Sequence, residues 1–299
     1  MQSSSSEEIL SVSSSSSSLS RNHNYGPELV STECMNKLKA LQIAFNELES
    51  QYFKSVYEFE YKFYQNCSYL FEKRTEIING KYEPNEEECR LRTDFIDTTD
   101  QASPSANDIL GIPMFWLQTL KQAPVIAEMI EEWDEPLLTC LNDIKLQLQL
   151  HPIIGFTLEF HFSGQAKQYF TNETLTKFYE LQIESDDQVL FYEGTSIIRS
   201  EGCRIDWIDS TTNVTRNANT GERQSSFFNF FTSPPLHEQW KLATDFQIGH
   251  YIREHIVPKA ILYYTGEIFD EYDFSDEDLN QQEISTIEQI GEGTHVTNN

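Results

Sequence analysis

The sequence predicts an α+β fold in which one very long helix precedes a domain of strands and helices. Three changes in the spacing of apolar residues indicate this. A helical stripe runs through residues 38–70, a two-residue alternation starts at residue 156, and a helical pattern returns after residue 243. The order of helices, antiparallel strands and helices is typical of the α+β class. A chain of 299 residues fits one or two domains.

The charge of the chain limits what it can bind. The sequence has 21 Lys and Arg against 48 Asp and Glu, a formal net charge of −27, and a pI near 4.5. A protein that binds duplex nucleic acid needs a basic face to displace counterions, and no such face is evident. The natural partner is therefore cationic. Because 38% of the residues are hydrophobic and 13% are aromatic, the chain can still build a core.

Residues 1–33 read as a disordered leader. Twelve of the first twenty residues are serine, and such a run buries too little apolar surface to offset the entropy of ordering it. The leader is either a kinase substrate or a solubilising extension, and composition does not separate the two.

A single long helix is predicted for residues 34–80. Its apolar residues recur at steps of three or four over 33 residues with no Pro or Gly between them. The helix would run from about residue 34 to residue 79, end at Gly80, and be about 70 Å long at 1.5 Å per residue. The stripe consists of Leu38, Leu41, Phe45, Leu48, Tyr52, Val56, Phe59, Phe63, Cys67 and Leu70.

A stripe of this length needs an equally long partner, and a second copy of the same helix supplies one. We therefore expect a homodimer in which the stripe residues other than Cys67 are the dimerisation contacts. Aromatic residues beside the stripe are expected to widen the buried face. They are Phe53, Tyr57, Tyr61, Tyr64 and Phe71. The alternative is that the stripe packs against the rest of its own chain.

Later elements follow from shorter patterns. Residues 81–108, rich in Pro, Asn, Asp and Ser, read as an accessory insert or linker, and residues 109–265 as the α+β domain. In that domain, residues 111–120 form an apolar element with Pro113 in a first helical turn, and an amphipathic helix covers residues 135–148.

Four strands and a last helix complete the prediction. Phe156, Leu158, Phe160 and Phe162 alternate with polar residues, as in a half-buried strand. Further candidate strands are 177–183, 188–192 and 203–208, and a helix over 243–264 is kinked at Pro258. Residues 266–299, with ten acids and no Lys or Arg, are expected to form an acidic disordered tail.

No pattern for catalysis, a metal or a cofactor is evident. The five cysteines are scattered without a CxxC pair, so free thiols are expected. His250 and His255 are five apart, which does not match a helical zinc motif, and His161 on a strand is expected to be exposed or hydrogen-bonded. The chain is predicted not to be an enzyme. It also lacks a membrane-spanning stretch and a signal-like N-terminus, so we expect a soluble, intracellular protein.

Nine segments of the chain carry specific residue patterns. They are FEKRTEIINGKYEPNEEEC at 71–89, GIPMFWL at 111–117, LEFHF at 158–162, YFTNE with LTK at 169–177, GCRIDW at 202–207, NVT at 213–215, SFFNFF with PP at 226–235, DFQIGHYIREHIVPK at 245–259 and YYTGE at 263–267. Together they resemble the nucleosome assembly protein family of histone chaperones. The resemblance covers about residues 34–275 in the family's order, which makes it far more specific than any single motif.

The resemblance implies a homodimer joined by paired long helices, with an acidic concave surface that receives core histones or other basic chromatin proteins. It implies no cofactor, no membrane contact and no sequence-specific nucleic-acid contact. The expected localisation is nucleus and cytoplasm. Matched to the family's acidic underside and tail, the histone-binding carboxylates would be Glu238, Asp245, Glu254, Glu267, Asp270, Glu271, Asp273, Asp276, Glu277 and Asp278. The block Phe227, Phe228, Phe230 and Phe231 is expected in the core.

Departures from the family pattern suggest a divergent or specialised paralogue. Family members carry a long basic hairpin before the Phe block, whereas only residues 215–225 remain here, with Arg216 and Arg223 as their cations. This leaves the route of nuclear import open. The preferred histone, phosphorylation of the leader and tissue restriction are also open. The alternative function is an acidic dimeric scaffold that inhibits or tethers a signalling enzyme.

Overall fold

The computed structural model describes residues 31–85, 87–88, 110–184, 190, 192, 194–235 and 237–268. Helix α1 (Thr32–Ile78) comes first, and the short helices α2 (Phe115–Lys121), α3 (Pro124–Ala127) and α4 (Glu135–Leu138) follow. Four strands come next: β1 (Leu141–Gln149), β2 (Gly155–Phe162), β3 (Thr174–Gln182) and β4 (Ser196–Gly202). The chain ends its described part with α5 (Gln239–Tyr251), a π-helical turn (Ile252–Ile256) and α6 (Val257–Thr265). The predicted α+β class is confirmed.

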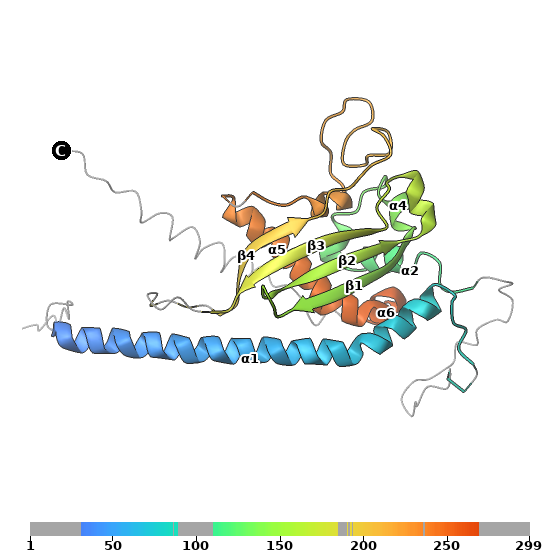
Figure 1. Cartoon of the computed structure of the whole chain (residues 1–299). Helices are drawn as coiled ribbons and strands as arrows, with labels where there is room; N and C mark the ends of the chain where they lie inside the picture. The colour runs from blue at the N-terminus through green and yellow to red at the C-terminus, as the bar shows by residue number, and fades with distance from the viewer. Residues whose placement is uncertain are drawn as a thin grey trace, which may run out of the picture.

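The four strands form one antiparallel sheet in the order β1-β2-β3-β4. Helices α5 and α6 cover one face of this sheet, and α1 runs along the domain and extends well past it at its N-terminal end (Figure 1). The covered face carries Phe156, Leu158 and Phe160 of β2, all fully buried, while Thr157, Glu159 and His161 between them are half-exposed. The core therefore lies between the sheet and the helices α2, α5 and α6.

The Phe block forms the 3-10 turn Phe227–Phe231 and its four rings are buried, as predicted. Phe160 of β2 packs edge-to-face on Phe227, Phe230 and Phe231, with ring centroids 5.2–6.1 Å apart. Asp134 anchors the turn, since its carboxylate accepts hydrogen bonds from the Ser226 hydroxyl and the Phe227 amide. These contacts place the block in the core rather than on the surface.

The helix predicted over 135–148 is wrong beyond its first turn. Residues from Leu141 onward form strand β1, and only Glu135–Leu138 is helical. The apolar set fits a helical face, but Ile144, Leu146 and Leu148 also alternate with the exposed Lys145 and Gln147. Over so short a run periodicity does not separate the two structures, and pairing with β2 decides the outcome.

The fourth strand lies earlier than predicted. Strand β4 is Ser196–Gly202, and the segment 203–208 predicted as a strand makes only an isolated bridge from Trp207 to Phe170. The Phe block crosses at the end of β4: a Cβ on Gly202 would lie 1.9 Å from the Phe231 carbonyl oxygen, and the Cys203 amide still donates to the Thr176 carbonyl of β3. The candidate strand 188–192 lies largely outside the described residues, and Leu190 and Tyr192 are not in a strand.

Two helical predictions need smaller corrections. Pro113 precedes α2 instead of occupying its first turn, since Met114 has a left-handed backbone and caps the helix. The predicted helix 243–264 is confirmed as α5, the π-helical turn and α6, with the non-helical residue Lys259 directly after Pro258. The break in helical geometry therefore lies at Lys259, next to the proline that cannot donate a backbone hydrogen bond.

The two ends of the insert predicted at 81–108 meet at one point. The Ile112 amide donates to the Ile78 carbonyl at 2.8 Å, and a Cβ on Gly111 would lie 2.3 Å from that same oxygen. Both Gly80 and Gly111 have positive φ, which suits glycine. The insert therefore leaves and re-enters the fold through one pair of glycines.

Because its ends adjoin, we expect the insert to be removable. Replacing residues 83–108 with a short Gly/Ser linker should change the thermal midpoint of unfolding by less than about 2 °C, since loop length affects stability weakly. Differential scanning calorimetry of the shortened and full chains measures this. As a control, Gly111→Val in the full chain should lower the midpoint, because the side chain cannot fit against Ile78. A large loss in the shortened chain would show that the insert packs on the domain.

Candidate functional site

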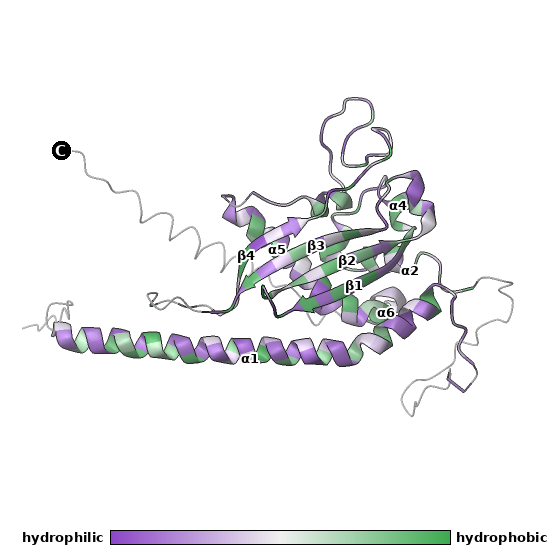
Figure 2. Cartoon of the chain, viewed as in Figure 1, coloured by the Kyte–Doolittle hydropathy of each residue, from purple (hydrophilic) through white to green (hydrophobic). Residues whose placement is uncertain are grey.

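The apolar stripe of α1 is exposed along its length. Leu48 is 66% exposed and Phe59 is 73% exposed, although large apolar side chains normally seek burial. Exposure above one third is shared by Leu38, Leu41, Phe45, Leu48, Tyr52, Val56, Phe59, Phe63 and Leu70. Figure 2 shows apolar positions recurring along the whole helix. Within one chain, the described elements leave these stripe residues uncovered. The stripe therefore does not pack against its own domain, which was the alternative to a dimer.

The aromatic residues beside the stripe face a different way. Successive helical residues turn by about 100°, which places Phe53, Tyr57, Tyr64 and Phe71 roughly a quarter turn from the stripe. Tyr57 is buried in the core of the same chain, and its hydroxyl donates to the Gly155 carbonyl. The expectation that these residues widen the stripe is therefore wrong. They form a second face that holds α1 on its own domain.

This second face is fixed by hydrogen bonds to backbone carbonyls. Three side chains of α1, spread along the part of the helix that lies on the domain, donate to carbonyl oxygens of the domain. The Ser50 hydroxyl donates to Ile183, the Tyr57 hydroxyl donates to Gly155, and the Arg74 guanidinium donates to Val257. Asn79 also donates to the Asn142 carbonyl. Because carbonyl positions are set by the domain backbone, these bonds fix the direction in which α1 leaves the domain.

Four of the ten predicted histone-binding carboxylates lie within the described residues. Glu267 follows α6 and is exposed. Glu238 precedes α5 and pairs with Lys241. Glu254 lies on the π-helical turn and pairs with Arg253 at 2.7 Å. Asp270, Glu271, Asp273, Asp276, Glu277 and Asp278 lie outside the described residues.

Asp245, the fourth, has an internal role. Its carboxylate lies 2.7 Å from the Lys177 ammonium and accepts a hydrogen bond from the Ser200 hydroxyl. Lys177 is fully buried, donates also to the Thr232 carbonyl, and lies over the Phe230 ring. Burial lowers the pKa of Lys177, and the adjacent Asp245 carboxylate opposes that shift. Asp245 thus neutralises a core lysine and has little charge to offer a partner.

Glu254 belongs to a cluster at the junction of α1 with the C-terminal helices. The buried Arg253 contacts Glu254 on its own turn and Glu60 on α1. Its guanidinium lies over the rings of Tyr57 and Phe156 at 5.5 and 5.0 Å. Desolvation raises the pKa of Tyr57 to about 12, although the nearby Arg253 opposes the shift. The sequence pattern did not reveal Glu60 as a partner of this cluster, because no local spacing links it to Arg253.

Among the described residues, the histidines and cysteines show no catalytic arrangement. His161 lies 3.0 Å from Glu159 and 3.2 Å from the Thr174 hydroxyl, as the hydrogen-bonded reading predicted. Burial lowers the pKa of both His250 and His255. Cys34, Cys67, Cys140 and Cys203 are free. In the described part of the chain, no three His, Cys, Asp or Glu side chains are grouped to hold a metal ion. None of the described helices is both long and apolar enough to span a membrane.

The fold and these surfaces define an acidic α+β protein with one long helix that exposes an apolar stripe. The model of the nucleosome assembly protein (NAP) family matches residues 33–267, and the chain belongs to this family.

Curated relatives and solved structures agree with that assignment. Nucleosome assembly protein 1-like 1-A of Xenopus laevis is 35% identical over 276 residues, which cover 80% of this chain and 70% of the relative. The human nucleosome assembly protein 1-like 1 is 35% identical over 277 residues, with the same coverage. Nucleosome assembly protein 1 from Plasmodium knowlesi is 25% identical with a TM-score of 0.55, covering 79% of this chain and 96% of that structure.

Proposed function

We propose that this chain is a histone chaperone, which binds basic core histones on acidic surfaces and delivers them for nucleosome assembly. The observation that carries the proposal is the family match over residues 33–267, in a chain with a net charge of −27. Histones mixed with free DNA bind it non-specifically through release of counterions. An acidic chaperone competes for the same basic surface and yields the histone once DNA can wrap it. This exchange needs no covalent step and places the protein at chromatin.

We further infer that the functional unit is a homodimer formed by the α1 stripe. Several exposed aliphatic and aromatic side chains on one helical face exceed what a monomer normally leaves in water. Residues 31–42 are exposed on every side, so that end of α1 has no cover from its own domain. A second α1 of the same length and pattern covers the stripe. The hydrogen bonds of the opposite face then fix how the two domains face each other.

The histone-binding charge is proposed to come mainly from the tail acids, with Glu238, Glu254 and Glu267 beside them. Glu238 and Glu254 already pair with cations of their own chain, so a histone lysine or arginine would share these carboxylates rather than find them free. The tail residues have no Lys or Arg among them. Many weak contacts of this kind give an affinity that falls as salt is added.

We expect neutralising the tail to weaken histone binding strongly. Changing Asp270, Asp273, Asp276 and Asp278 to Asn, and Glu271 and Glu277 to Gln, moves the net charge from −27 to −21. The affinity for core histones at about 0.15 M salt should fall at least tenfold, and its salt dependence should become shallower. Fluorescence anisotropy with labelled histone dimers and tetramers measures both quantities.

A matched control separates tail acids from net charge. Six exposed acids elsewhere can be neutralised in the same way, which also gives −27 + 6 = −21. They are Glu33, Glu47, Glu58, Glu72, Glu128 and Glu132. This variant should lose less than about threefold in affinity. Equal losses in the two variants would contradict a tail-centred site. A dimer that binds no histone at all would instead favour the acidic regulatory scaffold.

A further inference from the structure

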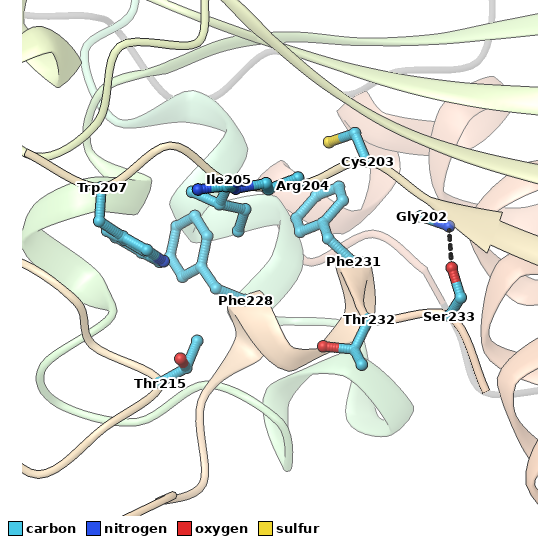
Figure 3. Close-up of a pocket in the computed structure, with 10 residues that line it drawn as sticks. All are labelled: Gly202, Cys203, Arg204, Ile205, Trp207, Thr215, Phe228, Phe231, Thr232 and Ser233. Carbon is cyan, nitrogen blue, oxygen red and sulfur yellow. Dashed lines mark hydrogen bonds between the residues drawn. The ribbon is translucent and has the colours of Figure 1, made fainter. Parts of the chain in front are cut away.

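The four tryptophans of the chain differ in what covers their rings. Trp116 is fully buried. Trp207 lines a hollow of about 310 Å³ at the end of β4 and packs edge-to-face on a ring of the Phe block (Figure 3). Trp240 is 67% exposed, but the Lys241 ammonium lies over its ring at 5.2 Å. Trp133 is 42% exposed, and no cation or other ring of the described residues lies over it. An open tryptophan ring is typical of a binding surface.

The Trp133 ring is held in one orientation. Its indole N–H donates to the Ser225 carbonyl at 2.9 Å. The turn that carries it is fixed by Asp134, which is fully buried and accepts hydrogen bonds from the Glu131 amide and the Ser226 hydroxyl. Both the ring and its turn are thus tied to the segment that leads into the Phe block. Because the ring is already ordered, a partner that stacks on it loses little affinity to ordering of this side chain.

The charge beside this ring is strongly negative. Residues 128–135 contain five acids and no Lys or Arg. Of the four that reach the surface, Glu131 and Glu135 are half-buried and the other two are exposed. Glu135 pairs with Lys121 at 2.6 Å, whereas Glu131 has no ion pair with any described residue. Solvent screens a half-buried charge less than an exposed one, so Glu131 is the carboxylate that attracts a cation most effectively here.

We propose that the open face of Trp133 binds an arginine side chain of the basic partner, with Glu131 as its counter-charge. The inference rests on the proposed chaperone function, because a basic chromatin protein would supply the arginine. A guanidinium is planar and weakly hydrated, so it stacks on an aromatic ring while its edge donates to a carboxylate. The ammonium of lysine is a compact and strongly hydrated charge. The site therefore favours arginine-rich over lysine-rich segments, a distinction that dispersed surface acids alone do not make.

The first arm of the test detects contact with the ring. The full chain is labelled with 5-fluorotryptophan, and Trp133→Phe assigns the Trp133 resonance among the four in the fluorine NMR spectrum. Two peptides of equal length and charge are titrated, one alternating Gly with Arg and the other Gly with Lys. The Trp133 resonance should shift at about three- to fivefold lower concentration of the arginine peptide. A resonance that stays in place, or that responds equally to both peptides, would overturn the proposal.

A matched pair of substitutions provides the second arm. Trp133→Ala should bring the affinities for the two peptides, measured by fluorescence anisotropy, to about the same value. Trp240→Ala removes the other exposed tryptophan, whose ring already carries Lys241, and should keep the arginine preference. Glu131→Gln leaves the ring in place and should weaken binding of both peptides.

Circular dichroism checks that each variant is folded, and the first arm does not depend on Trp133→Ala. An arginine preference that survives Trp133→Ala in a folded chain would overturn the proposal. Because no histone is present in either arm, that result would leave the chaperone function untouched.

Discussion

Replacing Leu48 and Phe59 with Glu is expected to convert the protein from a dimer into a folded monomer. Both side chains lie on the exposed α1 stripe, at 66% and 73% exposure, and neither contributes to the core of its own domain. Burying one such side chain is worth roughly 1.5–3 kcal/mol, and each substitution removes it from both copies. The double variant also puts four carboxylates into an apolar interface, where unpaired charge is strongly unfavourable.

The expected loss of dimer affinity exceeds a thousandfold, which corresponds to about 4 kcal/mol. Light scattering during size-exclusion chromatography should report 34.8 kDa for the variant, and twice that mass for the wild type. Gln51→Glu adds one carboxylate per chain, against two in the double variant, on a third side of α1 away from the stripe and from the domain, and should remain dimeric. A wild-type mass of 34.8 kDa would contradict the proposed role of the stripe. Circular dichroism must show that the variant keeps its domain folded.

Asp245→Asn is expected to destabilise the fold by about 3–5 kcal/mol. The change leaves the fully buried ammonium of Lys177, which lies over the Phe230 ring, without its carboxylate. Breaking a buried pair is costly because one charge stays behind. For a domain of this size, the thermal midpoint should fall by roughly 10 °C. Urea denaturation followed by tryptophan fluorescence measures the free energy of unfolding directly.

A double variant and a control at an exposed acid test whether Asp245 acts through its buried ion pair. Lys177→Met combined with Asp245→Leu removes both charges and should recover most of the stability lost in Asp245→Asn, as replacing a whole buried pair often does. Glu267→Gln, on the exposed residue after α6, should change stability by less than about 0.5 kcal/mol. If Asp245→Asn proved as mild as Glu267→Gln, the Lys177 pairing would not be a structural requirement.

How much the sequence predicted depended on the range of the interactions involved. The long helix and strand β2 were predictable because their apolar residues repeat over many positions, and each element largely follows its own period. Strand β1 was not, because Leu141, Ile144 and Leu148 fit a helical face while Ile144, Leu146 and Leu148 fit a two-residue alternation, and the pairing with β2 is decided elsewhere in the chain. Strand β4 ends where the Phe block crosses at Gly202, a contact between residues about 30 positions apart.

The same limit applies to the candidate site. The stripe was identified from spacing, but spacing alone assigned Phe53 and Tyr57 to the same interface, whereas they face the domain. Charge counting placed Asp245 among the partner-binding acids because a carboxylate in a sequence carries no sign of its counter-ion. Lys177 lies 68 positions before it, on the buried face of β3, and only the fold brings the two together. The carboxylate of such a buried ion pair is therefore easily mistaken for a binding residue.

The most direct test of the chaperone account is to mix the full chain with histone dimers and tetramers at about 0.15 M salt. Screening at this salt acts over about 8 Å, so a complex that survives chromatography reflects close contacts. Size-exclusion chromatography with light scattering should show a dimer that carries histones and that releases them when the tail is neutralised. A dimer that elutes free of histone under these conditions would contradict the account.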